Sequence, residues 1–92
     1  MSYTLQFSKT ALDDIKKHRK SGDKPTLKKI EKLLNELREH PMIGTGKPEV
    51  LKYESVDLYS RRINKQHRLV YTINDEIVTV HVLSLWSHYG DK

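Results

Sequence analysis

The hydrophobic pattern at the start of the chain changes from strand-like to helical at Ser8. Residues 3–7 alternate between apolar and polar side chains, which predicts a short β-strand. Ser8 is suited to the N-cap of a helix, and Phe7 and Leu12 are spaced to form a hydrophobic staple across that cap. The apolar stripe predicted for this first helix consists of Ala11, Leu12 and Ile15.

A second and more strongly patterned helix follows a break at residues 21–23. Asp23 predicts its N-cap, and Pro25 is tolerated in the first turn because the N–H that it lacks would have no helical partner there. Pro41 ends the helix, since a proline disfavours helical geometry in the residue before it. The apolar face of this helix consists of Leu27, Ile30, Leu33, Leu34 and Leu37.

The second half of the chain has the pattern of one loop and three strands. Gly44, Gly46 and Pro48 interrupt residues 41–52, which show no period and are predicted to form a loop. The glycines would let this loop approach another surface closely. The strands are predicted at residues 58–63, 67–73 and 76–85, with turns at 64–66 and 74–75 between them.

The last turn predicts how the final two strands pair. If residues 74–75 form a tight two-residue hairpin turn, Ile73 faces Glu76 and Arg68 faces His81. One face of the sheet is then apolar and suited to contact the helices, and the other is half polar and suited to remain open. The apolar face comprises Leu69, Tyr71, Val78, Val80 and Val82, and the open face comprises Arg68, Val70, Thr72, Thr79 and His81.

These elements predict an α+β fold. An N-terminal strand and a two-helix hairpin precede three strands, and the strands form an antiparallel sheet with both helices on one face. The other side of the sheet is expected to be concave and open. Dividing a chain of 92 residues would leave pieces too small to bury a core, so residues 1–92 are predicted to be a single domain.

Composition then narrows the classes of function. Lys and Arg number 17 against 12 Asp and Glu, and the net charge of +5 favours a polyanionic partner such as nucleic acid, or an acidic protein. The absence of cysteine excludes disulfide, thiol and iron–sulfur chemistry, and the five histidines lack metal-ligand spacing, so neither a metal nor another cofactor is expected. Without a long apolar run or a signal peptide, a cytoplasmic protein with no membrane partner is expected.

The open face can offer a carboxylate, arginines, a histidine and a tyrosine, and RNA cleavage by the 2′-hydroxyl of the RNA itself needs little more. A base removes the 2′ proton, cations stabilise the phosphorane, and an acid protonates the departing 5′ oxygen. Free glutamate, with a pKa of about 4.3, and histidine, with a pKa of about 6.5, can accept and donate at neutral pH. Glu49, Arg68, His88 and Tyr89 could supply these groups, although each one singly is more typical of an ordinary surface.

Four blocks in the second half of the chain resemble Txe/YoeB toxins, a branch of the RelE superfamily of bacterial toxin–antitoxin systems. In the order and spacing of that family they are residues 44–52 (GTGKPEVLK), 58–63 (LYSRRI), 67–71 (HRLVY) and 87–89 (SHY). The first half matches only as a strand–helix–helix pattern. The resemblance implies a curved RelE-like sheet and a toxin that inhibits translation by cutting mRNA in the ribosomal A site without a metal.

The resemblance also assigns roles to residues, motif by motif. Glu49 resembles the general base, and Arg68 resembles the arginine that steadies the scissile phosphate. His88 resembles the general acid, and Tyr89 resembles the aromatic residue that orients the substrate or stacks on a base. The resemblance thus places all four residues in one metal-independent endoribonuclease site.

Further residues around these motifs have weaker matches. Lys52 and Arg62 resemble supporting phosphate contacts, whereas Arg61 should point to the opposite face of its strand. Trp86 is expected to pack under the sheet. Family chains commonly stop near the tyrosine, and this one continues through residues 90–92, which displaces the terminal carboxylate; we expect activity to survive.

The same resemblance implies partners. A cognate antitoxin, acidic and partly disordered, would fold onto the toxin and neutralise it, and the complex could bind operator DNA through the antitoxin. The oligomeric state is left open, with a homodimer among the alternatives. Contacts with the ribosome and its mRNA would include phosphates bound by basic residues of the two helices. These residues are Lys16, Lys17, Arg19, Lys20, Lys28, Lys29 and Lys32.

Three alternatives to a ribosome-dependent nuclease remain at this point. A non-catalytic relative of the same fold could poison a protein target, as gyrase-inhibiting toxins of the superfamily do, and would not need the four site residues. A plain RNA-binding module could use the open face, but the central strands contain only Tyr59 and Tyr71 for stacking on bases. An enzyme that cuts free RNA is the third alternative.

Overall fold

The fold of the chain is α+β, as predicted. The computed structural model describes residues 2–46, 49–53 and 56–86, with the backbone alone described at 51–53 and 56–57. Within this part of the chain, no helix is both long and apolar enough to cross a membrane. The elements are β1 (Thr4–Phe7), α1 (Lys9–Ser21), α2 (Lys24–Glu39), β2 (Glu49–Tyr53), β3 (Val56–Arg62), β4 (Arg68–Asn74) and β5 (Thr79–Ser84).

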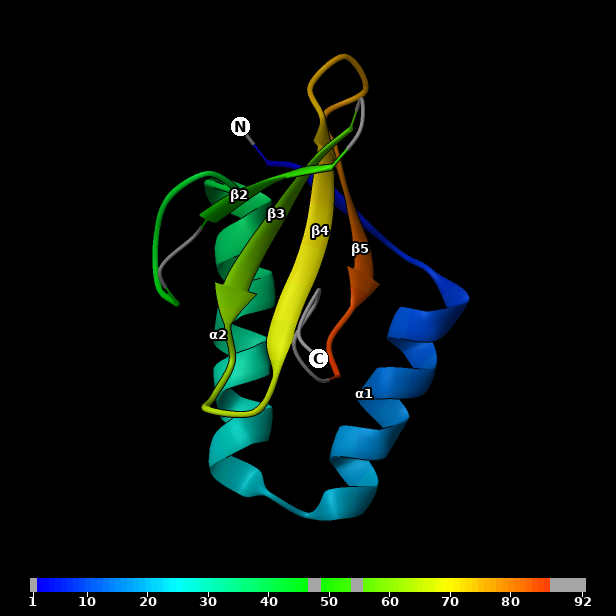
Figure 1. Cartoon of the computed structure of the whole chain (residues 1–92), viewed down its shortest axis with the longest axis vertical. Helices are drawn as coiled ribbons and strands as arrows, with labels where there is room; N and C mark the ends of the chain where they lie inside the picture. Colours follow the sequence, from blue (N-terminus) through cyan, green and yellow to red (C-terminus); the bar gives the residue numbers. More distant parts are fainter. Residues whose placement is uncertain (1, 47–48, 54–55, 87–92) are drawn as a thin grey trace.

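The strands form one five-stranded sheet in the order β1-β5-β4-β3-β2. In Figure 1 the central strands lie in front of α2, and α1 stands beside the end of β5. Both helices contribute to one core with the covered face of the sheet, which confirms the predicted layering. The fully buried side chains of this core include Leu33 and Leu37 from α2 and Leu69, Tyr71, Val80 and Val82 from the sheet.

The predicted helix caps are confirmed. The hydroxyl of Ser8 accepts a hydrogen bond from the backbone N–H of Ala11 at 3.0 Å, and the carboxylate of Asp23 accepts one from the N–H of Thr26 at 3.2 Å. Gly22 ends α1 with φ of 72°, a left-handed conformation that glycine adopts without a steric penalty. Local signals therefore fix the two-helix hairpin.

The apolar stripe predicted for α1 is wrong at Leu12. Leu12 is 50% exposed and does not belong to the buried face of the helix, while Ala11 is fully buried. The buried face instead includes Asp14 and His18, because α1 meets the end of β5 with side chains that bind its backbone. A hydrophobic pattern cannot identify polar residues that lie on the buried face of a helix.

The last hairpin is longer than predicted. Ile73 pairs with Val80 instead of Glu76, and His81 pairs with Thr72 instead of Arg68. The Asn74 side chain stabilises this wider loop, because it accepts hydrogen bonds from the backbone N–H groups of Glu76 and Ile77 at 3.0 and 3.3 Å. From Tyr71 to Asn74 the register has moved by four residues, an even number, so these residues keep their predicted faces. A bulge between Val70 and Tyr71 shifts the pairing by one more residue, and Val70 pairs with Ser84. Val70 and Thr79, predicted on the open face, are only 1% and 4% exposed, and Val78 lies in the loop with φ of 47°.

Two further pairings differ from the prediction. β1 runs parallel to β5, so the sheet is mixed. The chain between them contains two helices and three strands, and a connection of this length permits a parallel pair, which no hairpin can form. Residues 49–52, predicted as the end of a loop, belong to the edge strand β2 (Glu49–Tyr53), which is antiparallel to β3. Their side chains show no alternation in the sequence, and their strand character comes from pairing with β3.

Candidate functional site

Three strands bring polar residues together on the open face of the sheet. Glu49 of β2 lies opposite Ser60 of β3, and Arg62 of β3 lies opposite Arg68 of β4. Alternation along a strand puts these residues on one face and Arg61 on the other, which packs against the helices. Glu49 and Arg68, both singled out from the sequence, therefore share a surface.

Arg68 is held by two neighbours on this face. Its Nη1 donates to Glu49 Oε1 at 2.9 Å and to Ser60 Oγ at 3.0 Å. The hydroxyl of Ser60 is fully buried, the Arg68 side chain is 18% exposed, and the Glu49 side chain is 54% exposed. The buried hydroxyl of Ser60 thus holds the guanidinium of Arg68, and the carboxylate of Glu49 remains exposed to solvent.

The other predicted site residues are placed less completely. Arg62 is exposed and lies directly opposite Arg68. Lys52 lies in β2 opposite Asp57, and its side chain falls outside the described part of the structure. The predicted acid and aromatic partner, His88 and Tyr89, also lie outside the described residues.

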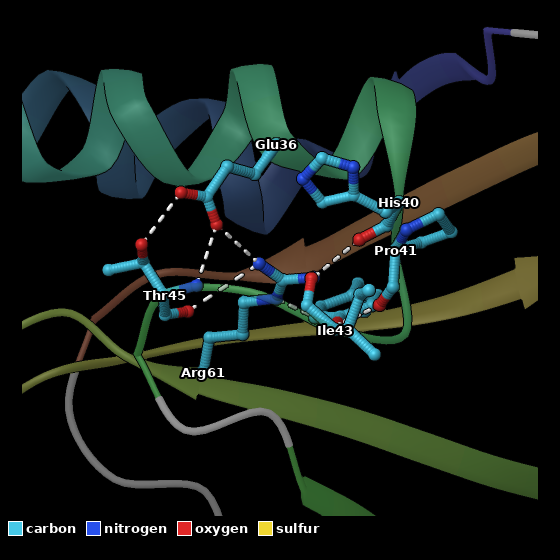
Figure 2. A network of polar contacts seen from close by, with 7 residues as sticks. Glu36, His40, Pro41, Ile43, Thr45 and Arg61 are labelled. Atoms are coloured by element: carbon cyan, nitrogen blue, oxygen red, sulfur yellow. Dashed lines mark hydrogen bonds and ion pairs between the residues drawn. The ribbon is translucent and has the colours of Figure 1, made fainter.

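Arg61, on the covered face, is fully buried and binds the loop that precedes β2 (Figure 2). Its Nη1 donates to Glu36 Oε1 at 2.9 Å, and its Nη2 donates to the carbonyl oxygens of His40 and Ile43 at 2.8 and 2.7 Å. Its Nε donates to the hydroxyl of Tyr71 at 3.1 Å. The predicted separation of Arg61 and Arg62 onto opposite faces is confirmed.

The loop is tied to Glu36 and Tyr71 as well. The Glu36 carboxylate accepts hydrogen bonds from the N–H and the hydroxyl of Thr45 at 2.8 and 2.7 Å, and the Tyr71 hydroxyl donates to the carbonyl of Pro41 at 2.6 Å. Burial acts to raise the pKa of Glu36, but the hydrogen bonds from Thr45 and the charge of Arg61 outweigh it and hold the pKa below its usual range. Burial raises the pKa of Tyr71, which therefore remains a neutral donor.

The two loop glycines approach other groups closely, as predicted. A Cβ on Gly44 would lie 2.5 Å from Glu36 Oε1, and a Cβ on Gly46 would lie 2.9 Å from the carbonyl oxygen of Arg62. Gly46 has φ of 87°, and its carbonyl accepts the N–H of Arg62 at 2.7 Å. The loop is thereby fixed to β3 shortly before Glu49.

Sequence reasoning missed Arg61 and Glu36 as the residues that fix this loop. The signal was present in the doublet Arg61-Arg62, because alternation requires one of two adjacent strand residues to face the core. A buried arginine needs acceptors for its five N–H groups, and a glutamate on the neighbouring helix face is one of the few partners a short chain can offer.

The basic residues predicted to contact RNA lie on the surfaces of the helices. All are exposed except Lys29, which is partly buried. The ammonium group of Lys17 lies 5.3 Å from the ring centroid of Trp86, and that ring packs against the imidazoles of His18 and His67 rather than under the sheet. Among the described residues, no three His, Cys, Asp or Glu side chains are grouped so that they could hold a metal ion.

The fold and this surface define a class: a small basic α+β protein with an arginine, its carboxylate partner and a second cation on the open face of a sheet. The family model described as "YoeB-like toxin of bacterial type II toxin-antitoxin system" matches residues 7–89. The chain therefore belongs to the YoeB-like toxins, within the RelE superfamily.

Relatives agree with this assignment. Toxin YoeB of Synechocystis sp. is 44% identical over 68 residues, which are 74% of this chain and 77% of that protein. A YoeB dimer from Staphylococcus aureus superposes with a TM-score of 0.79 at 40% identity, covering 97% of this chain and 100% of that one. YoeB in a heterotetrameric YoeB-YefM toxin–antitoxin complex from the same organism gives 0.75 at 40% identity, with the same coverage.

Proposed function

We propose that this toxin is a ribosome-dependent endoribonuclease that cuts mRNA in the A site by metal-independent acid–base chemistry. The observation that carries the proposal is the pair formed by Glu49 and Arg68, with Nη1 to Oε1 at 2.9 Å, on the open face of the sheet. In the attack of a 2′-hydroxyl on the adjacent phosphate, a general base is needed at the hydroxyl and a cation at the phosphate, and these two groups lie side by side here.

Glu49 is the base in this proposal. Its side chain is 54% exposed, so a ribose can approach the carboxylate without displacing a part of the protein. Pairing with Arg68 holds the carboxylate in one place on a strand. Positioned groups react faster than free ones because the entropic cost of orienting them is met before the reaction step. The base removes the proton of the 2′-hydroxyl, whose oxygen then attacks phosphorus.

Arg68 stabilises the negative phosphorane. Within the described part of the chain it donates through Nη1, and the rest of its guanidinium fork is free to bind phosphate oxygens. Arg62, directly opposite, brings a second positive charge. Two like charges facing each other across a sheet are unfavourable, and a bound anion would relieve that repulsion. Lys52 is proposed as a further phosphate contact.

His88 is proposed as the acid that protonates the departing 5′ oxygen, and Tyr89 as the side chain that orients the substrate. Support for both comes from the resemblance of residues 87–89 to the C-terminal motif of the family, and these residues lie within the range 7–89 that the family model matches. Histidine is suited to the task because its unperturbed pKa, about 6.5, leaves it partly protonated at neutral pH.

The partners proposed here follow the relatives. The YoeB-YefM complex supports an antitoxin that binds and neutralises this chain, and the YoeB dimer supports a homodimer. The exposed lysines and arginines of the helices are proposed to bind ribosomal RNA in the cytoplasm through its phosphates. Operator DNA would be bound by the antitoxin within the complex.

The test is cleavage of one mRNA, either programmed on ribosomes or free, with 5′ ends mapped by primer extension. We expect a discrete cut in the A site with ribosomes and none in free mRNA. Glu49→Gln should abolish the cut, whereas Glu39→Gln, which changes an exposed glutamate of α2, should preserve it. Cleavage of the free mRNA would favour a ribosome-independent nuclease. An uncut mRNA in both samples, from folded protein free of antitoxin, would favour a toxin that inhibits a protein target.

The RNA-binding alternative loses support from the placement of the tyrosines. Tyr59 and Tyr71 stack on each other, with ring centroids 5.6 Å apart, and Tyr71 is fully buried. They belong to the covered face and its core, so they do not offer a stacking platform on the open face.

A further inference from the structure

Two polar side chains of α1 are buried where a helical pattern would place apolar ones. Asp14 and His18 are 4% and 2% exposed and lie one helical turn apart on the same face. Burying a polar group is costly unless it forms hydrogen bonds, so each of these residues needs a specific partner.

Both side chains bind one residue, Leu85, just beyond β5. The Asp14 carboxylate accepts the N–H of Leu85 at 2.9 Å, and His18 Nε2 lies 2.8 Å from the carbonyl oxygen of Leu85. A carbonyl oxygen can only accept, so Nε2 carries the hydrogen and donates it. Together the two side chains satisfy both backbone groups of Leu85, as a neighbouring strand would.

These contacts continue the pairing along one edge of β5. β1 pairs with β5 as far as Phe7 and Val82, and the N–H of Ser8 donates to the carbonyl of Val82 at 3.0 Å. The hydroxyl of Ser8 then donates to the carbonyl of Leu83 at 2.8 Å. Asp14 and His18 take over at Leu85, where α1 runs beside the outgoing chain (Figure 1).

The next residue is fixed by ring contacts. The ring of Trp86 lies 4.9 Å from that of His18 and 4.3 Å from that of His67, centroid to centroid. His18 therefore contacts two successive residues, Leu85 through its N–H and Trp86 through its ring. The direction of the backbone is defined at Leu85 and again at Trp86.

We propose that Asp14 and His18 are positioning residues for catalysis: they fix the path of the chain from β5 toward His88, three residues beyond Leu85. The proposal rests on the proposed function, in which His88 is the general acid. Releasing Leu85 would let the start of the C-terminal segment move, and misplacement of a catalytic group by about 1 Å can slow a reaction about a hundredfold.

The test compares variants that remove each hydrogen bond with variants that retain it. Asp14→Leu and His18→Leu keep bulk and lose the acceptor or the donor. Asp14→Asn keeps a carbonyl oxygen that can accept, and His18→Gln keeps an amide N–H that can donate. Ile30→Val is the matched control, because it removes a methyl group from the same core and leaves both hydrogen bonds to Leu85 in place.

Three measurements separate positioning from folding. Single-turnover cleavage at saturating programmed ribosomes reports the chemical step, and toxin binding to the same ribosomes reports affinity. Amide hydrogen exchange at Leu85, with fluorescence of Trp86, the only tryptophan in the chain, reports whether the contacts with α1 persist. We expect both leucine variants to cut about tenfold to a hundredfold more slowly with unchanged ribosome binding and faster exchange at Leu85. The Asn, Gln and Ile30→Val variants should cut at close to the wild-type rate.

The outcomes distinguish this proposal from the one on which it rests. Absence of cleavage by the wild-type protein would overturn the proposed function, while exchange at Leu85 would still show whether α1 fixes the chain. If the wild type cuts and the folded leucine variants cut equally fast, the positioning role is overturned and the nuclease stands. If the leucine variants do not fold, the folded Asn and Gln variants decide: loss of cleavage in these would overturn the proposal, and retention would support it.

Discussion

Arg61 and Arg68 lie in neighbouring strands and carry the same side chain to opposite faces of one sheet. Arg61 is fully buried and donates to Glu36, to Tyr71 and to backbone carbonyls of the loop after α2. Arg68 is partly exposed and, among the described residues, donates to Glu49 and Ser60 through one nitrogen. Arg61, on the covered face, fixes a loop, whereas Arg68, on the open face, has N–H groups left to bind a ligand.

The difference shows how a structural arginine can be told from a working one. Burial alone does not decide, because Arg68 is only 18% exposed. The use of the guanidinium decides: an arginine whose N–H groups are taken by protein acceptors has none left for a ligand. Arg61 is therefore expected to govern stability and Arg68 activity, and four experiments can test that division.

The largest effect is expected for Arg61→Met. Removing one partner of a buried ion pair leaves Glu36 without its cation and two backbone carbonyls without their donor, which typically costs about 3–5 kcal/mol. That is a large share of the roughly 5–15 kcal/mol by which a domain is usually stable. Urea denaturation measures the free energy of unfolding. A loss below about 1 kcal/mol would contradict the structural role of Arg61.

Arg68→Ala should have the reverse profile. Loss of a cation that stabilises the transition state is expected to slow cleavage about 10²- to 10³-fold, while the free energy of unfolding changes by less than about 1 kcal/mol because the pair with Glu49 is partly exposed. Arg68→Lys should recover only part of the rate, since an ammonium group lacks the guanidinium fork. Single-turnover cleavage on programmed ribosomes measures both variants. A lysine variant that cuts at the full rate would show that the mechanism does not need the guanidinium geometry of Arg68.

Two glycines give a matched pair for the loop that Arg61 closes. Gly46→Ala should destabilise the protein by about 2 kcal/mol or more, because φ is 87° and the new Cβ would meet the backbone of Arg62 at 2.9 Å. Gly22→Ala carries a similar backbone cost at φ of 72° but meets nothing within 4 Å. The difference between the two unfolding free energies isolates the close approach of the loop to β3. Equal losses would show that this approach contributes nothing.

The smallest effect is a pH dependence from Glu36. Its pKa is lowered from the usual 4.5, so its contribution to stability is complete above that value and is lost as pH falls through the lower pKa of the folded protein. Glu36→Gln should therefore be less stable than the wild type at neutral pH, by about 1–2 kcal/mol, and the gap should close in acid. Unfolding free energies of both proteins across the acid range measure this gap. A gap that widened as the pH fell would mean that folding raises the pKa of Glu36 instead of lowering it.

The parts of the fold that the sequence predicted are those set by local chemistry. Ser8 and Asp23 cap helices through their own side chains, and the two faces of β4 follow from alternation. From Tyr71 to Asn74 the faces survived although the predicted turn was wrong, because an even shift of register keeps a side chain on its side of the sheet. The side of the sheet that carries Arg68 was predictable for the same reason, whereas Glu49, predicted in a loop, was joined to Arg68 only by the resemblance to the family.

What escaped prediction depends on partners that are distant in the chain. Strand β2 exists through its pairing with β3, and β1 pairs with a strand more than seventy residues later. Asp14 and His18 lie outside the apolar stripe predicted for the first helix, and their burial depends on hydrogen bonds to the residue that follows β5. A hydrophobic pattern reports how much a position prefers burial, and it cannot report a polar residue whose burial is made favourable by one particular backbone group.

The loop closed by Arg61 also has a consequence for the newly made protein. Thr45 and Arg61 are 16 residues apart, and Pro41 and Tyr71 are 30 residues apart. The contacts that set the chain in front of Glu49 therefore cannot form until the ribosome has synthesised β3 and β4. If Glu49 is the base, as proposed, the toxin acquires an oriented base only when most of the chain has left the ribosome that made it.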